Sequence, residues 1–99
     1  MIYAYLVAAG RVQGVFFRKY VCEISRKLFV NGRIWNEKDG TVRIQCECKS
    51  DYHLSEFIHE IKHSKPSEEY LGIRIDKLEI IEKKTISKPT FSSFEIVYH

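Results

Sequence analysis

The amino-acid sequence predicts an α+β sandwich, in which two helices cover one face of a single sheet. Three observations support this class: two segments with helical periodicity, a strong hairpin signal between them, and apolar segments of strand length towards both ends of the chain. A hairpin that separates two helices is typical of split β-α-β arrangements. The 99 residues suffice for one such domain, residues 1–99, and leave no room for a second core.

The start of the chain supplies a strand, a loop and a helix. Ile2 to Ala9 is apolar and short enough for a buried strand, and a loop that contains Gly14 begins at Gly10. An amphipathic helix is expected from about Phe17 to Phe29, because apolar residues recur there at spacings of three and four: Phe17, Tyr20, Val21, Ile24 and Leu28.

Two strands form the predicted hairpin, at residues Gly32 to Asn36 and Thr41 to Cys48. The Asp39-Gly40 pair between them is the hairpin signal, because both residues accept the backbone conformations that a tight turn needs. Alternation places Ile34 and Asn36 on one strand face and Arg33 and Trp35 on the other.

A second helix follows, and two more strands complete the chain. Ser50 or Asp51 can cap this helix, which is expected to end around Ser64, before Pro66. Its buried stripe consists of Leu54, Phe57, Ile58 and Ile61. The remaining strand candidates are Ile73–Glu82 and Phe91–Tyr98, separated by a polar stretch in which Pro89 excludes a central strand.

The complete prediction is a ferredoxin-like β-α-β-β-α-β sandwich, with an antiparallel sheet, two helices on one face and an additional C-terminal edge strand. Right-handed crossovers make the first and second strands parallel, although the third strand lies between them. Their carboxyl ends then emerge at the same edge of the sheet. The loop Gly10–Arg18 and the strand end at Asn36 should therefore lie close together.

The loop Gly10–Arg18 has the properties of a phosphate cradle. It leads from a strand into a helix N-terminus, where unpaired N–H groups and the positive end of the helix dipole favour an anion. Gly14 allows successive N–H groups to point inward, and Arg18 adds a planar fork of donors. The alternative is a turn that needs two glycines beside a solvated arginine.

Two segments resemble the signatures of a known family. The run GRVQGVFFR, residues 10–18, resembles the phosphate-binding signature of acylphosphatases, and NGRIWNEKDGTV, residues 31–42, resembles the second signature of that family. The resemblance extends over nearly the whole chain in length, element order and the Phe-rich last strand.

The resemblance implies a function and a set of site residues. Acylphosphatases hydrolyse the carboxyl-phosphate bond of small acyl phosphates to a carboxylate and inorganic phosphate, without a metal or another cofactor. By this resemblance Arg18 binds phosphate and Asn36 orients the attacking water. The amides of the cradle that hold the phosphate belong to Gln13, Gly14, Val15, Phe16 and Phe17.

The residue types fit this chemistry independently. The carboxylate is already a good leaving group, so no general acid is required. What remains is to hold the phosphoryl group, to neutralise its charge and to aim a water in line, and loop amides, Arg18 and an uncharged amide such as Asn36 suit these tasks. The alternative for Asn36 is a plain turn residue before the Asp-Gly pair.

The sequence departs from the family pattern at several positions. Arg33 and Trp35 invert the usual order of an aromatic and a polar or basic residue, Cys48 replaces a glycine, Ala8 is smaller than the usual aliphatic residue, and Lys65-Pro66 stands where Gly-Pro is common. These exchanges concern the open sheet face and the specificity for the leaving group.

Three alternative functions can be weighed on the sequence. Cys46 and Cys48 followed by His59 and His63 could suggest zinc, but periodicity points the thiols inward and the histidines to water. A nucleic-acid-binding module shares this topology, yet the outward positions of the third strand carry no aromatic residue. A catalytically silent interaction domain does not explain why Arg18 and Asn36 are both intact.

Composition limits partners and compartment. Sixteen Lys and Arg against 13 Asp and Glu give a net charge of +3, which suits a small anionic ligand but is too little for a nucleic-acid-binding stripe. Three cysteines cannot form a complete disulfide framework, so a reduced cytoplasmic protein is expected. The expected partners are an acyl phosphate substrate and inorganic phosphate, as product and competitive inhibitor, with no membrane and no obligate protein partner.

Overall fold

The computed structural model describes residues 1–64 and 67–98, and the order of its elements is the predicted one. The predicted departure at Lys65-Pro66 lies outside the described residues. The elements are β1 (Ile2–Arg11), α1 (Phe17–Leu28), β2 (Asn31–Asn36), β3 (Val42–Cys48), α2 (Asp51–His63), the 3-10 turn η1 (Glu68–Tyr70), β4 (Arg74–Thr85) and β5 (Phe94–Ile96).

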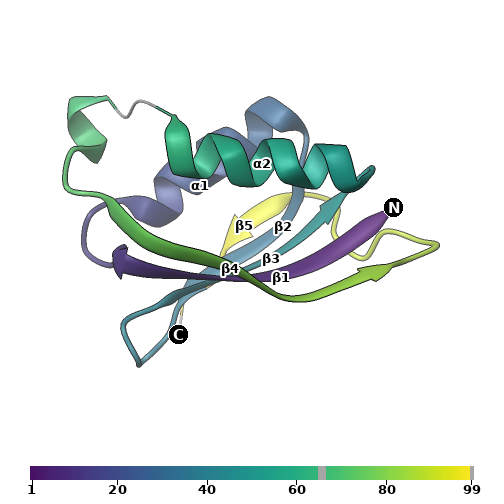
Figure 1. The fold of residues 1–99 in the computed structure, drawn as a ribbon, viewed down its shortest axis with the longest axis horizontal. Coiled ribbons are helices and arrows are strands. Elements are labelled where there is room, and N and C mark those ends of the chain that lie inside the picture. Colours follow the sequence, from purple (N-terminus) through teal and green to yellow (C-terminus); the bar gives the residue numbers. More distant parts are fainter. Residues whose placement is uncertain (65–66, 99) are drawn as a thin grey trace.

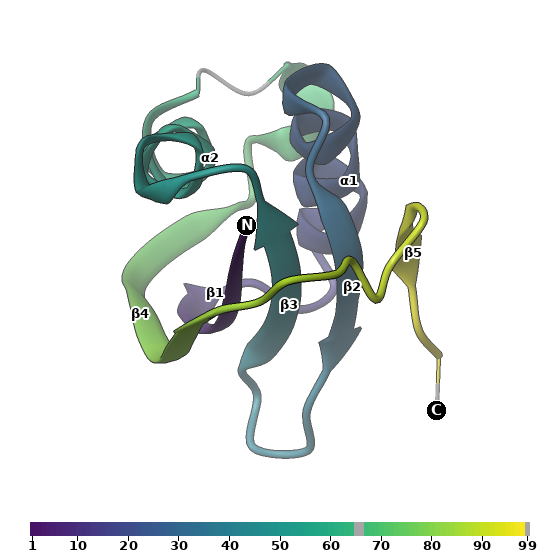
Figure 2. The same ribbon diagram turned by 90° about the vertical axis from the view of Figure 1, so that its right-hand side faces the viewer.

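The five strands form one sheet in the order β4-β1-β3-β2-β5, and α1 and α2 cover one face of it (Figure 1). The pairs among β1 to β4 are antiparallel, as predicted. β5 instead pairs with β2 in parallel, so the sheet is mixed. The reason is that β4 ends at the same end of the sheet at which β2 begins. From there the chain crosses the sheet to its far edge, and β5 then runs in the same direction as β2 (Figure 2).

The first strand is longer than the sequence predicts, because Gly10 and Arg11 still pair with β4. Gly10 adopts a φ of 130°, and a Cβ atom there would lie 2.3 Å from the carbonyl oxygen of Arg74. Only glycine tolerates this conformation and this approach of the two backbones. The glycine at the expected start of the loop is therefore part of an irregular strand pair, and the loop begins at Val12.

Alternation along the strands builds the core as expected. Ala4, Leu6 and Ala8 of β1 are fully buried under the helices, whereas Tyr3 and Tyr5 lie on the opposite face. The core continues through β2, β3 and the helices, and its largest members include Phe17, Ile34, Ile44, Phe57 and Ile61. The small Ala8 is fully buried and lies opposite Val42 of β3.

The predicted orientation of the cysteines and histidines is confirmed. Cys46 and Cys48 are buried, whereas His59 and His63 are exposed on α2. Within residues 1–64 and 67–98, no three His, Cys, Asp or Glu side chains come together as metal ligands. The four residues that suggested zinc do not converge.

Helix boundaries agree with the sequence to within one residue. The Ser50 hydroxyl accepts a hydrogen bond from the His53 N–H (3.2 Å), so Ser50 rather than Asp51 caps α2. At the C-terminal end of α1, Phe29 adopts a φ of 58° and terminates the helix.

Glu47 fixes the segment that leads to β5. Its side chain is on the open face of the sheet, but only 4% of the residue is exposed. The segment of residues 86–93, which crosses β3 on its way from β4 to β5 (Figure 2), is hydrogen-bonded to it. The carboxylate accepts hydrogen bonds from the N–H groups of Thr90 and Phe91, both at 2.8 Å at their shortest. The end of β3 thereby holds the start of the C-terminal strand.

Replacing Glu47 by alanine is expected to lower the free energy of unfolding by about 2 kcal/mol, since two backbone N–H groups lose their acceptors. Urea denaturation measures this change. The exposed Glu95 on β5 is the matched control, and Glu95→Ala should change stability by less than about 0.5 kcal/mol. Equal effects of the two substitutions would show that the Glu47 contacts contribute nothing specific.

Candidate active site

The loop between β1 and α1 has a backbone suited to anion binding. Gly14 and Phe16 both adopt left-handed conformations, with φ values of 72° and 64°. Alternation of such residues with others curls a loop so that successive N–H groups point towards one place. Apart from its two chain neighbours, no described residue has an atom within 4 Å of a Cβ placed on Gly14, so the loop borders open space there.

The N-terminus of α1 is left without a protein cap. Phe16 occupies the cap position and offers no side-chain hydrogen bond, and the first turn contains no acidic residue. The first helical hydrogen bond runs from the Tyr20 N–H to the Phe16 oxygen (3.0 Å). Among the residues described, none accepts a hydrogen bond from the backbone N–H groups of residues 13–19. Free donors at a helix N-terminus form an anion site.

A hollow of about 420 Å³ lies beside this loop. Its walls come from the loop, the first turn of α1 and the C-terminal strand, and its lining residues are Val12, Gly14, Phe16, Phe17, Arg18, Lys19, Ile96 and Tyr98. Four of the predicted phosphate-binding residues are therefore together: Gly14, Phe16, Phe17 and Arg18. The other two, Gln13 and Val15, do not line it: the Gln13 side chain is hydrogen-bonded to the hairpin between β2 and β3, and the Val15 side chain packs against the core.

Arg18 and Lys19 bring two positive charges to the hollow, and only Lys19 forms an ion pair within the described residues. Lys19 forms an ion pair with Glu69, and the hydrogen bond to that carboxylate raises the pKa of the lysine. Arg18 forms no ion pair within the part of the chain described. Its guanidinium carbon lies 5.0 Å from the centre of the Tyr98 ring, so its donors remain available to an anion.

The wall formed by β5 is the part of the site that the sequence does not predict. Ile96 pairs with Ile34 of β2 in the parallel ladder, and the Tyr98 ring lies beside Arg18. An additional edge strand is expected from the sequence, but its short apolar pattern does not indicate which strand end it reaches.

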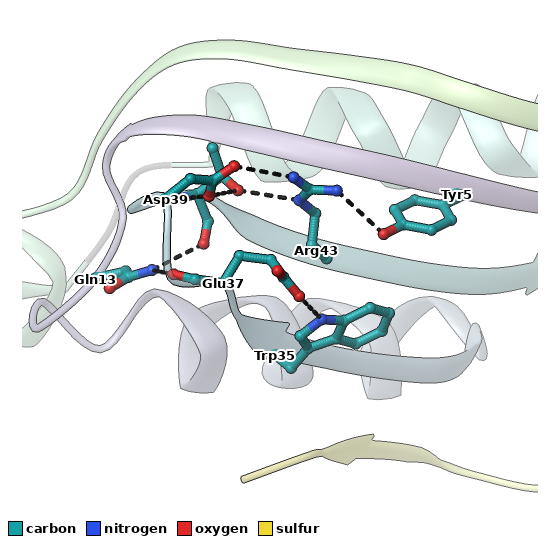
Figure 3. A network of polar contacts seen from close by, with 7 residues as sticks. Tyr5, Gln13, Trp35, Glu37, Asp39 and Arg43 are labelled. Carbon is teal, nitrogen blue, oxygen red and sulfur yellow. Dashed lines mark hydrogen bonds and ion pairs between the residues drawn. The ribbon is translucent and has the colours of Figure 1, made fainter. Parts of the chain in front are cut away.

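Asn36 ends β2 on the same face as the buried Ile34, as alternation predicts. Its side-chain oxygen is buried and, among the described residues, has no hydrogen-bond partner. Asn36 is not one of the residues that line the hollow. The expected proximity of loop and strand end is nevertheless present, because the Gln13 amide donates hydrogen bonds to Glu37 and Thr41, directly beyond Asn36 (Figure 3).

The hairpin beyond Asn36 is held by polar contacts. Asp39 accepts hydrogen bonds from the Thr41 hydroxyl (2.6 Å) and from Arg43 (3.0 Å), and Arg43 also reaches the Tyr5 hydroxyl (Figure 3). The Thr41 hydroxyl and N–H lower the pKa of Asp39, and Arg43 contributes further. Trp35 donates to Glu37 (2.7 Å).

The departures Arg33 and Trp35 lie on the face opposite Asn36. Arg33 is stacked over the Trp35 ring at 5.7 Å, and Trp35 meets Tyr5 edge to face. These residues belong to the open face of the sheet, as the sequence predicts, and not to the loop that would hold phosphate.

A family model for acylphosphatases matches residues 4–96. The chain belongs to the acylphosphatase family. The acylphosphatase of Lactococcus lactis (strain IL1403) is 34% identical over 93 residues, which cover 94% of this chain and 95% of the relative. Human acylphosphatase-2 is 39% identical over 90% of this chain and 85% of its own length. The crystal structure of a Bacillus subtilis acylphosphatase superposes with a TM-score of 0.81, at 28% identity, covering 99% and 100% of the two chains.

The predicted family, fold and enzyme class are thus confirmed. The chain is an acylphosphatase, and the family activity is the hydrolysis of acyl phosphates to a carboxylate and phosphate. The nucleic-acid-binding alternative requires aromatic side chains on the open face of β3, where this acylphosphatase carries Arg43, Gln45 and Glu47. No helix within the described residues is long and apolar enough to cross a membrane.

Proposed function

We propose that this acylphosphatase, as a single domain of residues 1–99, binds the phosphate of a small acyl phosphate with its loop amides and Arg18, and orients a water with Asn36. The observation that carries the proposal is the uncapped N-terminus of α1, with unpaired N–H groups beside a guanidinium free of ion pairs among the described residues. The amides in question belong to residues 13–17, and Arg18 adds the cation.

The reaction requires in-line displacement at phosphorus. The water oxygen forms a new bond to phosphorus while the bond from phosphorus to the acyl oxygen breaks, and its electron pair leaves with the carboxylate. The protons of the water remain on the new phosphate or pass to solvent. Negative charge on the phosphoryl oxygens is stabilised by fixed N–H dipoles and Arg18, which need no reorganisation during the step.

Asn36 suits the orientation of water because its buried oxygen lacks a partner among the described residues. An amide oxygen that accepts a hydrogen bond from water fixes one O–H direction and leaves a lone pair free for attack. Unlike a carboxylate, the amide adds no negative charge beside the phosphate. Positioning of this kind lowers the barrier mainly by removing entropy.

The proposal includes no metal or other cofactor, because the carboxylate leaving group needs no Lewis acid. It also places the protein in the cytoplasm, which the free thiols of Cys22, Cys46 and Cys48 support. No nucleic acid, membrane or obligate protein partner is required.

Inorganic phosphate is expected to inhibit acetyl phosphate hydrolysis competitively, since product and substrate share the cradle. Initial rates are measured at several phosphate concentrations, in EDTA and at constant ionic strength, with chloride as the control anion. Hydrogen exchange should also slow at residues 13–19 when phosphate is added. Activity that EDTA abolishes and a divalent metal restores would overturn the proposal, as would phosphate inhibition that leaves the apparent KM unchanged.

A further inference from the structure

We propose that the side chain of Gln13 is a positioning residue, which holds Asn36 at a fixed place relative to the phosphate loop. This inference rests on the proposed function, because it concerns the distance between the loop that would bind phosphate and Asn36, which would orient the water. In the proposed function Gln13 contributes only its backbone amide. Its side chain has a separate task on the hairpin.

The Gln13 amide nitrogen donates two hydrogen bonds across the two strands of the hairpin. One runs to the Glu37 carbonyl oxygen (2.8 Å) and the other to the Thr41 carbonyl oxygen (2.9 Å) (Figure 3). Both partners are acceptors, so the nitrogen of the amide must face the hairpin. Both of its N–H groups are used there, and the bonds are partly shielded from water.

These bonds lie at the level of Asn36. Glu37 follows Asn36 directly and also donates its N–H to the Thr41 oxygen (2.9 Å), which closes the mouth of the hairpin. Asn36 is paired with Val42 in the sheet, one residue beyond Thr41. The amide of Gln13 therefore bridges the two arms of the hairpin directly beyond the last pair of β2 and β3.

The hairpin is held internally, so a displacement would move it as a unit. Hydrogen bonds connect its residues to one another and to the sheet: Trp35 donates to Glu37, and Thr41 and Arg43 both donate to Asp39. Within the described chain, both hydrogen bonds that join the phosphate loop to the hairpin come from Gln13. Loss of this side chain would leave the cradle and the hairpin intact but unconnected.

This arrangement predicts an effect on the rate and not on phosphate affinity. A misplacement of about 1 Å between a reacting group and its substrate can lower a rate about 100-fold. The cradle amides and Arg18 do not depend on the Gln13 side chain for their own contacts. Binding of phosphate should therefore survive a change that impairs the placement of water.

Gln13→Met keeps the length of the side chain and removes both donors. We expect kcat for acetyl phosphate to fall at least tenfold, while the inhibition constant of inorganic phosphate changes less than about threefold. Gln45→Met is the matched control, because Gln45 donates to Tyr3 on the open sheet face, and it should retain wild-type kinetics. Phosphate affinity that falls in parallel with kcat would show that Gln13 shapes the cradle, and would overturn the inference.

A double variant separates this inference from the proposed function. If Gln13 acts through Asn36, Gln13→Met should change activity less than twofold when Asn36 is already alanine. Multiplied losses overturn the inference and leave the proposed function standing, whereas an unimpaired Asn36→Ala enzyme overturns both. Urea unfolding verifies the fold of each variant. Should Gln13→Met not fold, Gln13→Asn, which is one methylene shorter, gives the same comparison.

Discussion

Arg18→Ala should lower kcat/KM for acetyl phosphate by about 1,000-fold, which corresponds to a loss of about 4 kcal/mol of transition-state stabilisation. The reason is that Arg18 forms no ion pair within the described residues, so its charge is free to neutralise the phosphoryl group. The stability of the fold should change little, because the contact with the Tyr98 ring is worth about 1 kcal/mol at most in an exposed setting. Steady-state kinetics and urea unfolding measure the two effects.

Two further variants test whether the effect depends on the guanidinium. Arg18→Lys keeps the charge but loses the planar fork, so its activity should lie between those of wild type and Arg18→Ala. Arg26→Ala removes an exposed arginine from the last turn of the same helix and should leave kinetics unchanged. Activity of Arg18→Ala within tenfold of wild type, or an equal loss in Arg26→Ala, would contradict the role of Arg18.

Local signals account for most of the fold. Alternation on β2 places Ile34 in the core and Trp35 on the open face, because a strand with one buried face specifies the direction of every side chain. The Asp39-Gly40 pair and the periodic apolar stripes define the hairpin and the helices in the same way. These features need no knowledge of distant residues, and the sequence predicts them within a few positions.

The C-terminal strand depends on contacts that the sequence does not express locally. β5 has three residues, and its parallel pairing with β2 follows from the crossing of residues 86–93 over Glu47. Neither the charge of Glu47 nor the polar segment above it indicates that they meet. As a result the loop between β1 and α1 is expected from the sequence, but the wall that Ile96 and Tyr98 add beside it is not.

The sequence does not indicate the bridge made by Gln13 either, for a different reason. Its acceptors are the carbonyl oxygens of Glu37 and Thr41, which every residue type provides. No pattern at those two positions reports the contact. The contacts of this polar side chain are therefore visible only in the three-dimensional structure.

Asn36→Ala should reduce kcat for acetyl phosphate about 100-fold, by analogy with the loss of one positioned polar group in an active site. The substitution should leave the free energy of unfolding nearly unchanged or raise it. The side-chain oxygen is buried without a partner among the described residues, and removing such an acceptor can raise the free energy of unfolding by about 1 kcal/mol. A residue that lowers stability while supporting activity is selected for its chemistry and not for the turn.

The other asparagine of β2 gives the contrasting result. The Asn31 amide donates to the Phe91 oxygen (3.4 Å) on the segment before β5, so Asn31→Ala should lower stability by about 0.5–1 kcal/mol and retain catalysis. If Asn36 were only a turn residue, its alanine variant would behave as Asn31→Ala does. Denaturation and kinetics on the two variants therefore decide between a catalytic and a structural Asn36. A catalytic Asn36 predicts a large loss of kcat without a loss of stability, whereas a structural Asn36 predicts a loss of stability without a loss of kcat.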